Sequence, residues 1–262
     1  MLTGISNVAI AEETQLTILT SNEPPMNFEH QGKITGLITE YVELLRQDTP
    51  ASEPIKLAPW ARVLEAGRTQ PNTMIFSTEK SPSRSPNFHW VGPIMAKRWF
   101  FLAKHPEDYS FNTLDDYKQV ENIGVLRADN RESWLLEQGF DNLYPVNNLE
   151  QAYKMLQEKR LDIVLTGDVE HSYMVRYFPE FNNLHGVFDV NVAYSYLAFS
   201  KFTCESILQA WQHAFEANKN HPQLQEMKKK WGQHIEQTLV LKDGMFSLAQ
   251  ADSVAIRQPK GK

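Results

Sequence analysis

The chain has 262 residues, of which 42% are hydrophobic and 22% charged, a composition typical of a soluble globular protein with one large domain or two lobes. Its formal net charge of −6, without a basic stripe, argues against nucleic-acid binding. The single cysteine, Cys204, excludes an intrachain disulfide and a cysteine-based metal cluster, and the scattered histidines match no zinc motif. We therefore expect neither a metal nor another cofactor.

The N-terminal residues 1–13 contain a small-x-small step, Val8-Ala-Ile-Ala-Glu12, of the kind that signal peptidase cuts. Two interpretations remain open. The segment is either the tail of a signal peptide or a disordered N-terminus with alanines there by chance. The first agrees with an exported protein, so we expect a periplasmic location. The chain has no apolar run of 18 residues, so we expect no membrane span.

The first elements of the chain alternate between strands and helices. Short apolar runs predict strands over 15–20, 55–58 and 73–76, and helical spacing of apolar residues predicts helices over 35–46 and 60–67. This βαβαβ order predicts a lobe with a parallel sheet.

Two long apolar strands, over about 97–103 and 192–199, bracket a second α/β unit. The elements predicted between them are, in order, helix 114–118, strand 122–126, helix 130–138, strand 143–146, helix 149–157, strand 162–166 and helix 169–178. A helical region then covers 204–233, with an interruption near 218–222.

The element order predicts an α/β protein in which one lobe is inserted into another, with the two bracketing strands as a hinge. Each lobe is expected to be a mostly parallel sheet flanked by helices. Ligands of open α/β sheets bind beyond the carboxyl ends of the strands, so we expect both lobes to face one cleft that closes around a ligand. Residues 14–101 and 197–240 are assigned to lobe 1, residues 102–196 to lobe 2, and residues 241–262 to a C-terminal extension whose 251–262 portion is expected to be disordered.

The most informative motif follows the third predicted strand and runs from Ser77 to Pro93, with the sequence STEKSPSRSPNFHWVGP. Small hydroxyl residues and free backbone N–H groups at a strand end can donate hydrogen bonds to an anion. The lone Arg84 can grip a carboxylate with two parallel bonds. The alternative is a solvated loop with a surface arginine.

Four segments together resemble bacterial extracellular solute-binding proteins of family 3, the amino-acid-binding type of periplasmic binding protein with a type II fold. The segments are Pro24-Pro-Met-Asn-Phe28 with Gly36, Ser81-Pro-Ser-Arg84 with Phe88-His-Trp-Val-Gly-Pro93, Leu156 to Val164, and Lys228 to Trp231. Their order and spacing extend the resemblance over about residues 14–235. The resemblance implies a monomer that captures a small carboxylate-bearing ligand, an amino acid or a relative, for an ABC-type importer and its permease.

In the first lobe, the resemblance implies that Arg84 binds the α-carboxylate of the ligand and that Ser81 replaces the usual threonine as a hydroxyl donor. Ser77 stands where the strand end meets the amino group of the ligand. Trp60 and Phe28 would cover its apolar body, although simple core packing is an equal alternative for Trp60.

In the second lobe, the segment from Arg127 to Asn130 matches a loop at a helix N-terminus that donates N–H groups to the carboxylate. It carries Ala128-Asp129 where the family has Gly-Thr. An aspartate would repel a bound anion unless its side chain caps the helix instead. Asp168 lies near the acidic partner of the ligand ammonium but is displaced by one position, because Gly167 intervenes. An N-cap role is its alternative.

Departures from the family pattern leave the ligand class open. Glu23 stands where relatives often carry a stacking aromatic, and it could engage an amine or face solvent. Glu79 and Lys80 could contact the ligand or each other. Two other functions remain open: a ligand-binding sensor or accessory protein, and a dehydratase-like enzyme with Glu23 or Glu79 as the general acid. We see no nucleophile–base constellation in the sequence, and we do not expect an enzyme.

Overall fold

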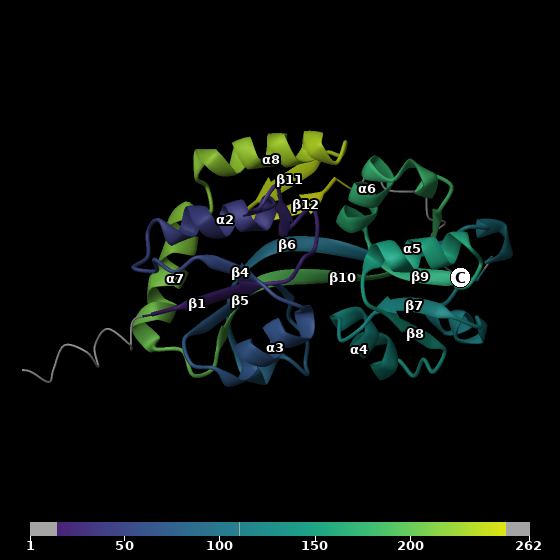
Figure 1. Ribbon diagram of the computed structural model, residues 1–262, viewed down its shortest axis with the longest axis horizontal. Helices are drawn as coiled ribbons and strands as arrows, with labels where there is room; N and C mark the ends of the chain where they lie inside the picture. The colour runs from purple at the N-terminus through teal and green to yellow at the C-terminus, as the bar shows by residue number, and fades with distance from the viewer. Residues whose placement is uncertain (1–14, 110, 250–262) are drawn as a thin grey trace, which may run out of the picture. The chain divides into compact units, whose positions relative to one another are not determined.

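The computed structural model describes residues 15–109 and 111–249 (Figure 1). These residues form two compact units. Unit 1 holds the chain up to Ala96 together with Tyr194–Trp231 and Leu239–Ser247, and unit 2 holds Lys97–Ala193, Gly232–Thr238 and the chain from Leu248. The two boundaries between the units therefore lie a few residues before the predicted ones. Residues 232–238 belong to unit 2, although they were assigned to the first lobe. The predictions for residues 1–13 and 251–262 lie outside the described residues.

The sheet of unit 1 has the strand order β4-β1-β5-β10. β1 (Thr17–Thr20) is parallel to β4 (Ile55–Leu57) and to β5 (Thr73–Glu79), while β10 (His185–Ser200) pairs with β5 in the antiparallel direction. All seven positions of β5 are buried, as expected for a central strand of a parallel sheet. The parallel core of the first lobe is therefore confirmed.

The crossovers between these parallel strands contain α2 (Leu37–Arg46) and α3 (Trp60–Thr69). The helical spacing that predicted α2 corresponds to its buried face, which includes Leu37, Ile38, Tyr41, Val42, Leu44 and Leu45. Both helices agree with the predicted ranges within about two residues.

Two hairpins in the described residues were not predicted. β2 (Phe28–His30) pairs with β3 (Lys33–Thr35), and the two turn residues between them both have positive φ, as a type I′ turn requires. β11 (Leu239–Lys242) and β12 (Met245–Leu248) are joined by Asp243-Gly244, which also have positive φ.

The second hairpin corrects the assignment of 241–262 to an extension. Phe246 of β12 is wholly buried, its register partner is Met95 in β6 (Phe88–Ala103), and its ring packs at 90° against that of Tyr41. Residues 241–247 therefore belong to the folded body of unit 1. Before this hairpin come α7 (Glu205–Asn218) and α8 (Pro222–His234), which match the interrupted helical region of the prediction.

The sheet of unit 2 has the strand order β6-β9-β7-β8. β7 (Ile123–Leu126) is parallel to β8 (Leu143–Val146) and to β9 (Ile163–Gly167), and β6 is antiparallel to β9. The helices that follow these strands are α4 (Asn130–Glu137), α5 (Leu149–Gln157) and α6 (Asp168–Tyr177). The predicted bracketing strands correspond to β6 and β10, which each continue from one unit into the other.

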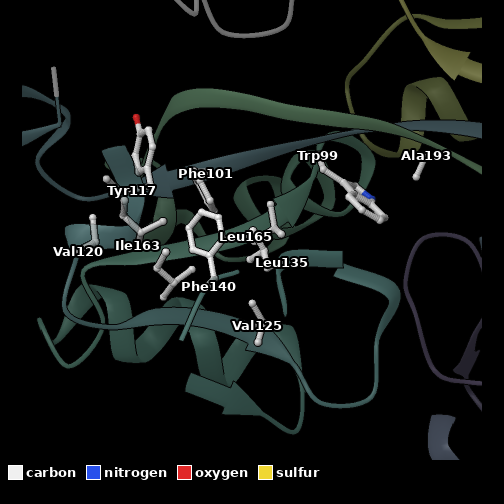
Figure 2. Close-up of a cluster of buried hydrophobic side chains, with 12 residues drawn as sticks. Trp99, Phe101, Tyr117, Val120, Val125, Leu135, Phe140, Ile163, Leu165 and Ala193 are labelled. Carbon is white, nitrogen blue, oxygen red and sulfur yellow. The ribbon is translucent and has the colours of Figure 1, made fainter. Parts of the chain in front are cut away.

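The apolar run of β6 serves two hydrophobic cores of unit 2. Trp99, Phe101 and Ala103 lie in one cluster, and Phe100 and Leu102 lie in another. This division follows from the alternation of side chains along a strand. Figure 2 shows the first cluster, where the ring centroids of Phe101 and Phe140 are 6.4 Å apart.

The remaining short elements are 3-10 helices, at Ser85–Asn87, Pro106–Asp108, Leu114–Gln119 and Pro179–Phe181. The third of these corresponds to the short helix predicted over 114–118 and is a 3-10 helix. Its N-cap Thr113 and Asp116 form a reciprocal capping box, which satisfies the first turn. Among the described helices, none combines the length and hydropathy needed to cross a bilayer.

Candidate functional site

The chain after β5 folds into a tight turn that carries the predicted anion-binding residues. The carbonyl oxygen of Ser81 accepts hydrogen bonds from the backbone N–H groups of Arg84 (3.2 Å) and Ser85 (2.8 Å). Arg84 exposes only 7% of its surface, so the alternative of a solvated surface arginine is wrong. The hydroxyl of Ser81 lies 3.1 Å from that of Ser83.

The guanidinium of Arg84 lies between an aromatic ring and a carboxylate. Its Cζ is 5.2 Å from the ring centroid of Trp60, within the range of a cation–π contact. Its Nη1 is 3.9 Å from Oε2 of Glu79, which is longer than a hydrogen bond. Both charged side chains are nearly buried. A guanidinium held in this way presents a rigid fork that matches a carboxylate.

Trp60 packs in the core, which was one of the two interpretations of this residue, and its predicted contact with a ligand stays a prediction. It is the first residue of α3, and its ring packs on the cluster of Val63, Ile75 and Phe88. The same ring lies against the guanidinium of Arg84. The core packing of Trp60 therefore determines the position of the cation.

Ser77 lies where β5 departs from regular pairing. Its φ of 58° is in the left-handed region, and the register between β5 and β10 shifts between Tyr196 and Ala198, beside this residue. The Ser77 hydroxyl donates a hydrogen bond to Oδ1 of Asn27, whose Nδ2 donates to the carbonyl oxygen of Ser21. The hydroxyl thus joins the end of β5 to the loop after β1. Its predicted contact with the amino group of a ligand stays a prediction.

Glu23 and Phe28 belong to the same loop and its following strand. The backbone of Glu23 pairs with that of Asn27 in an isolated β-bridge, and Glu23 itself is half-buried. The buried ring of Phe28 packs edge-to-face against Trp231 of α8, with centroids 6.1 Å apart. This packing joins two segments that carry the family resemblance. A role of either residue at a ligand stays a prediction.

In unit 2, the N-terminus of α4 is bonded to carboxylates of the protein itself. The N–H of Ala128 donates to Oε2 of Glu132 (2.5 Å), and the N–H of Arg131 donates to Oδ1 of Asp129 (2.9 Å). Asp129 is the N-cap of the helix, which was the condition we set for an aspartate at this position. The Ala128 amide, one of the candidate donors to a ligand carboxylate, therefore has an internal acceptor.

Arg127 and Asn130, the flanking residues of this loop, differ in exposure. Arg127 is exposed, and its Nη2 donates to the carbonyl oxygen of Pro145 (3.4 Å). Asn130 is buried as the first residue of α4. Their ligand contacts stay predictions.

Asp168 is the first residue of α6, and the N-cap is Gly167, so the N-cap alternative is wrong. Oδ1 of Asp168 accepts hydrogen bonds from the backbone N–H groups of Arg98 (3.2 Å) and Val169 (2.9 Å). Burial, together with the negative charge of Glu170, raises the pKa of Asp168 to about 7. The side chain is therefore partly protonated at neutral pH.

The buried charge network next to Asp168 was not predicted from the sequence. Oε1 of Glu170 lies 3.2 Å from Nζ of Lys97 and 3.5 Å from Nη1 of Arg131. Nε and Nη2 of Arg131 contact the two carboxylate oxygens of Asp129 at 2.7 and 3.1 Å. Two cations and two carboxylates thus balance each other inside unit 2.

The Glu170 carboxylate of this network explains why residue 167 is a glycine. A Cβ at this position would lie 2.2 Å from Oε2 of Glu170, so a side chain here would require the Glu170 carboxylate to move. Lys97, a charged residue beside the apolar run of β6, was the available signal for the network. In the described part of the chain, no group of three His, Cys, Asp or Glu side chains could hold a metal ion.

No family model and no curated protein matches the sequence. Several solved structures match the fold. A histidine kinase sensor domain with similarity to periplasmic binding proteins aligns with a TM-score of 0.74 at 17% identity, over 83% of this chain and 96% of its own. The arginine-, lysine-, histidine-binding protein ArtJ from Geobacillus stearothermophilus aligns with a TM-score of 0.70 at 17% identity, over 85% and 100% of the two chains.

A third structure comes from the glutathione import system of Streptococcus mutans, GshT and the cystine ABC importer TcyBC. It aligns with a TM-score of 0.73 at 13% identity, over 88% of this chain and 98% of its own. At these identities the likeness shows the fold. The chain therefore has a periplasmic-binding-protein-like fold, as the sequence motifs predicted.

Proposed function

We propose that the protein is a periplasmic solute-binding protein that captures a small carboxylate-bearing ligand, an amino acid or a related molecule, for an ABC-type importer. The observation that carries this proposal is the buried guanidinium of Arg84, stacked on Trp60 at the end of β5. The fold supports it, because proteins that share this fold bind arginine, lysine and histidine or belong to a glutathione import system.

The surroundings of Arg84 suit a zwitterion. The guanidinium can donate two parallel hydrogen bonds to a carboxylate, and Glu79 at 3.9 Å offers an acceptor for an ammonium group beside it. Hydrogen bonds to charged groups contribute about 1.5–3 kcal/mol each when the site excludes water. A few such bonds give a binding protein useful affinity without a large contact surface.

A sensor role is the second candidate, because one structure with this fold is a histidine kinase sensor domain. The two roles share the ligand site and differ in the partner that recognises the bound state. A dehydratase-like activity would need a carboxylic acid to protonate a leaving group. In this structure Glu79, a candidate for that acid, lies next to the cation of Arg84. We therefore propose binding rather than catalysis.

The proposal is tested by ligand binding to the Arg84→Ala variant. A thermal-shift screen of amino acids and small organic acids identifies ligands, since a ligand at 100 times its Kd stabilises the folded state by about 2.7 kcal/mol. Calorimetric titration should then show that Arg84→Ala weakens binding by about 2–5 kcal/mol. Arg84→Lys, which keeps the charge but loses the planar fork, should retain only part of the affinity.

The exposed Arg68 of α3 provides the matched control, and Arg68→Ala should leave binding unchanged. If Arg84→Ala, folded as judged by circular dichroism, bound the same acids as tightly as the parent, the anion site would lie elsewhere. Incubation of the bound acids followed by product analysis separates binding from catalysis, and turnover would overturn the choice of a binding protein.

A further inference from the structure

A second cation lies at the end of β5, beside the turn that carries Arg84. Nζ of Lys80 is 6.0 Å from the ring centroid of Trp90 and 5.8 Å from that of Tyr196. The two rings pack edge-to-face with centroids 5.7 Å apart, and the N–H of Lys80 donates to the carbonyl oxygen of Tyr194 (3.3 Å). Cation–π contacts extend to about 6 Å, so the ammonium of this exposed residue lies at the outer limit of contact with both rings.

Lys80 and Arg84 are attached to the same turn and the same core cluster. Lys80 immediately precedes Ser81, whose carbonyl oxygen accepts the N–H groups of Arg84 and Ser85. Nε1 of Trp90 donates to the carbonyl oxygen of Ser85 (3.4 Å), which ties this ring to the same turn. Trp60 and Trp90 both pack on the core cluster that contains Val63, Ile75, Phe88 and Ala198.

The two cations at this turn differ in whether an acidic side chain lies beside them. Arg84 has the carboxylate of Glu79 at 3.9 Å. Lys80, by contrast, forms no ion pair with any residue in 15–109 or 111–249. Other lysines of unit 1 do pair with acids, as Lys219 does with Glu216 and Lys230 with Glu40. The turn therefore presents one positioned ammonium whose charge no described residue neutralises.

We propose that the ligand carries a second acidic group, and that Lys80 binds this group while Arg84 binds the first. The inference rests on the proposed function and narrows the ligand to dicarboxylic acids, dicarboxylic amino acids included. The rings of Trp90 and Tyr196 lie beside the ammonium and favour this position of the cation. The amides of Ala128, in the loop before α4, and of Arg131, in its first turn, are bonded to internal carboxylates, so we do not assign the second acid to them.

The test compares dicarboxylates with their monoamides, which keep the size and lose one charge. The probes are glutamate with glutamine, aspartate with asparagine, succinate with succinamate and glutarate with glutaramate, titrated calorimetrically into the full chain. We expect at least one dicarboxylate to bind about tenfold or more tightly than its monoamide. Lys80→Gln should abolish this preference while changing the affinity of the monoamide less than twofold, and Lys80→Arg should preserve it.

Lys201 is the matched control, because it is also an exposed lysine of unit 1 whose Nζ lies over an aromatic ring, at 5.0 Å from Phe202. Lys201→Gln should bind both members of each pair like the parent. Equal affinities of the parent protein for both members, or an equal loss for both in Lys80→Gln, would overturn the second acid site. If Arg84→Ala still weakened the binding of these acids in that case, the proposed function would stand. Failure of every acid to bind the parent would overturn both.

Discussion

Replacing Asp168 with asparagine isolates the effect of one carboxylate that titrates near neutral pH. Its pKa rises from 3.8 to about 7 in the folded protein, chiefly because burial disfavours the charged form. Three pH units correspond to about 4 kcal/mol at 1.36 kcal/mol per unit, which is an upper bound for the effect on stability. Asparagine retains Oδ1, the atom that accepts the N–H groups of Arg98 and Val169.

The direction of the pH effect follows from proton linkage. A group with a raised folded-state pKa binds its proton more tightly in the folded protein. Its contribution to stability is therefore fully present below pH 3.8 and is lost as the pH rises through about 7. At pH 8 the parent protein carries a buried charge that Asp168→Asn lacks. We expect the variant to be about 1–3 kcal/mol more stable there, and the difference to vanish near pH 4.

Urea unfolding at pH 4.5, 6 and 8 measures this difference directly. The exposed Asp141 supplies the control, because Asp141→Asn makes the same change in charge without removing a buried carboxylate. A stability difference between parent and Asp168→Asn that stays constant over this pH range would refute the reasoning. A variant less stable than the parent at pH 8 would refute it as well.

Two glycine positions give further predictions. Gly167→Ala should lower the free energy of unfolding by about 3 kcal/mol, because its Cβ would displace the Glu170 carboxylate from a buried ion-pair network. Chemical unfolding measures this loss. A loss below about 1 kcal/mol would show that the Glu170 carboxylate can move without breaking the network. Gly244→Ala combines a φ of +79° with a Cβ that would lie 2.8 Å from Cβ of Lys219, whereas Gly32→Ala has a φ of +74° and no atom within 4 Å. Thermal unfolding should therefore show Gly244→Ala to be the more destabilised of the two by about 1–3 kcal/mol, and equal losses would mean that backbone strain alone decides.

The alternation of strands and helices could be predicted because it depends on local signals. The buried run of β5 and the helical spacing of α2 are visible within ten residues of sequence. The hairpin at Asp243-Gly244 also had a local signal, since Asp-Gly is a favoured type I′ turn. The hairpin at Gln31-Gly32 had a weaker one, because glutamine seldom adopts positive φ.

The candidate site was predictable in part for the same reason. The motif after β5 located Arg84, and its burial against Trp60 follows from the core packing of α3. The partners of charged groups in unit 2 depend on residues far apart in sequence, such as Lys97 and Glu170. The sequence marks Lys97 as a charge beside an apolar run, but it does not say which distant acid pairs with it, so the pairing became visible only in the structure.

The division of β6 between two cores constrains the length of that strand. Trp99 and Phe101 pack on one side of the sheet of unit 2, and Phe100 and Leu102 pack on the other. Inserting or deleting one residue just before this run would move every one of these side chains to the opposite face of the sheet, where they would not fit the packing of the other core. Length changes should therefore be tolerated in the loops of this protein long before they are tolerated in this strand.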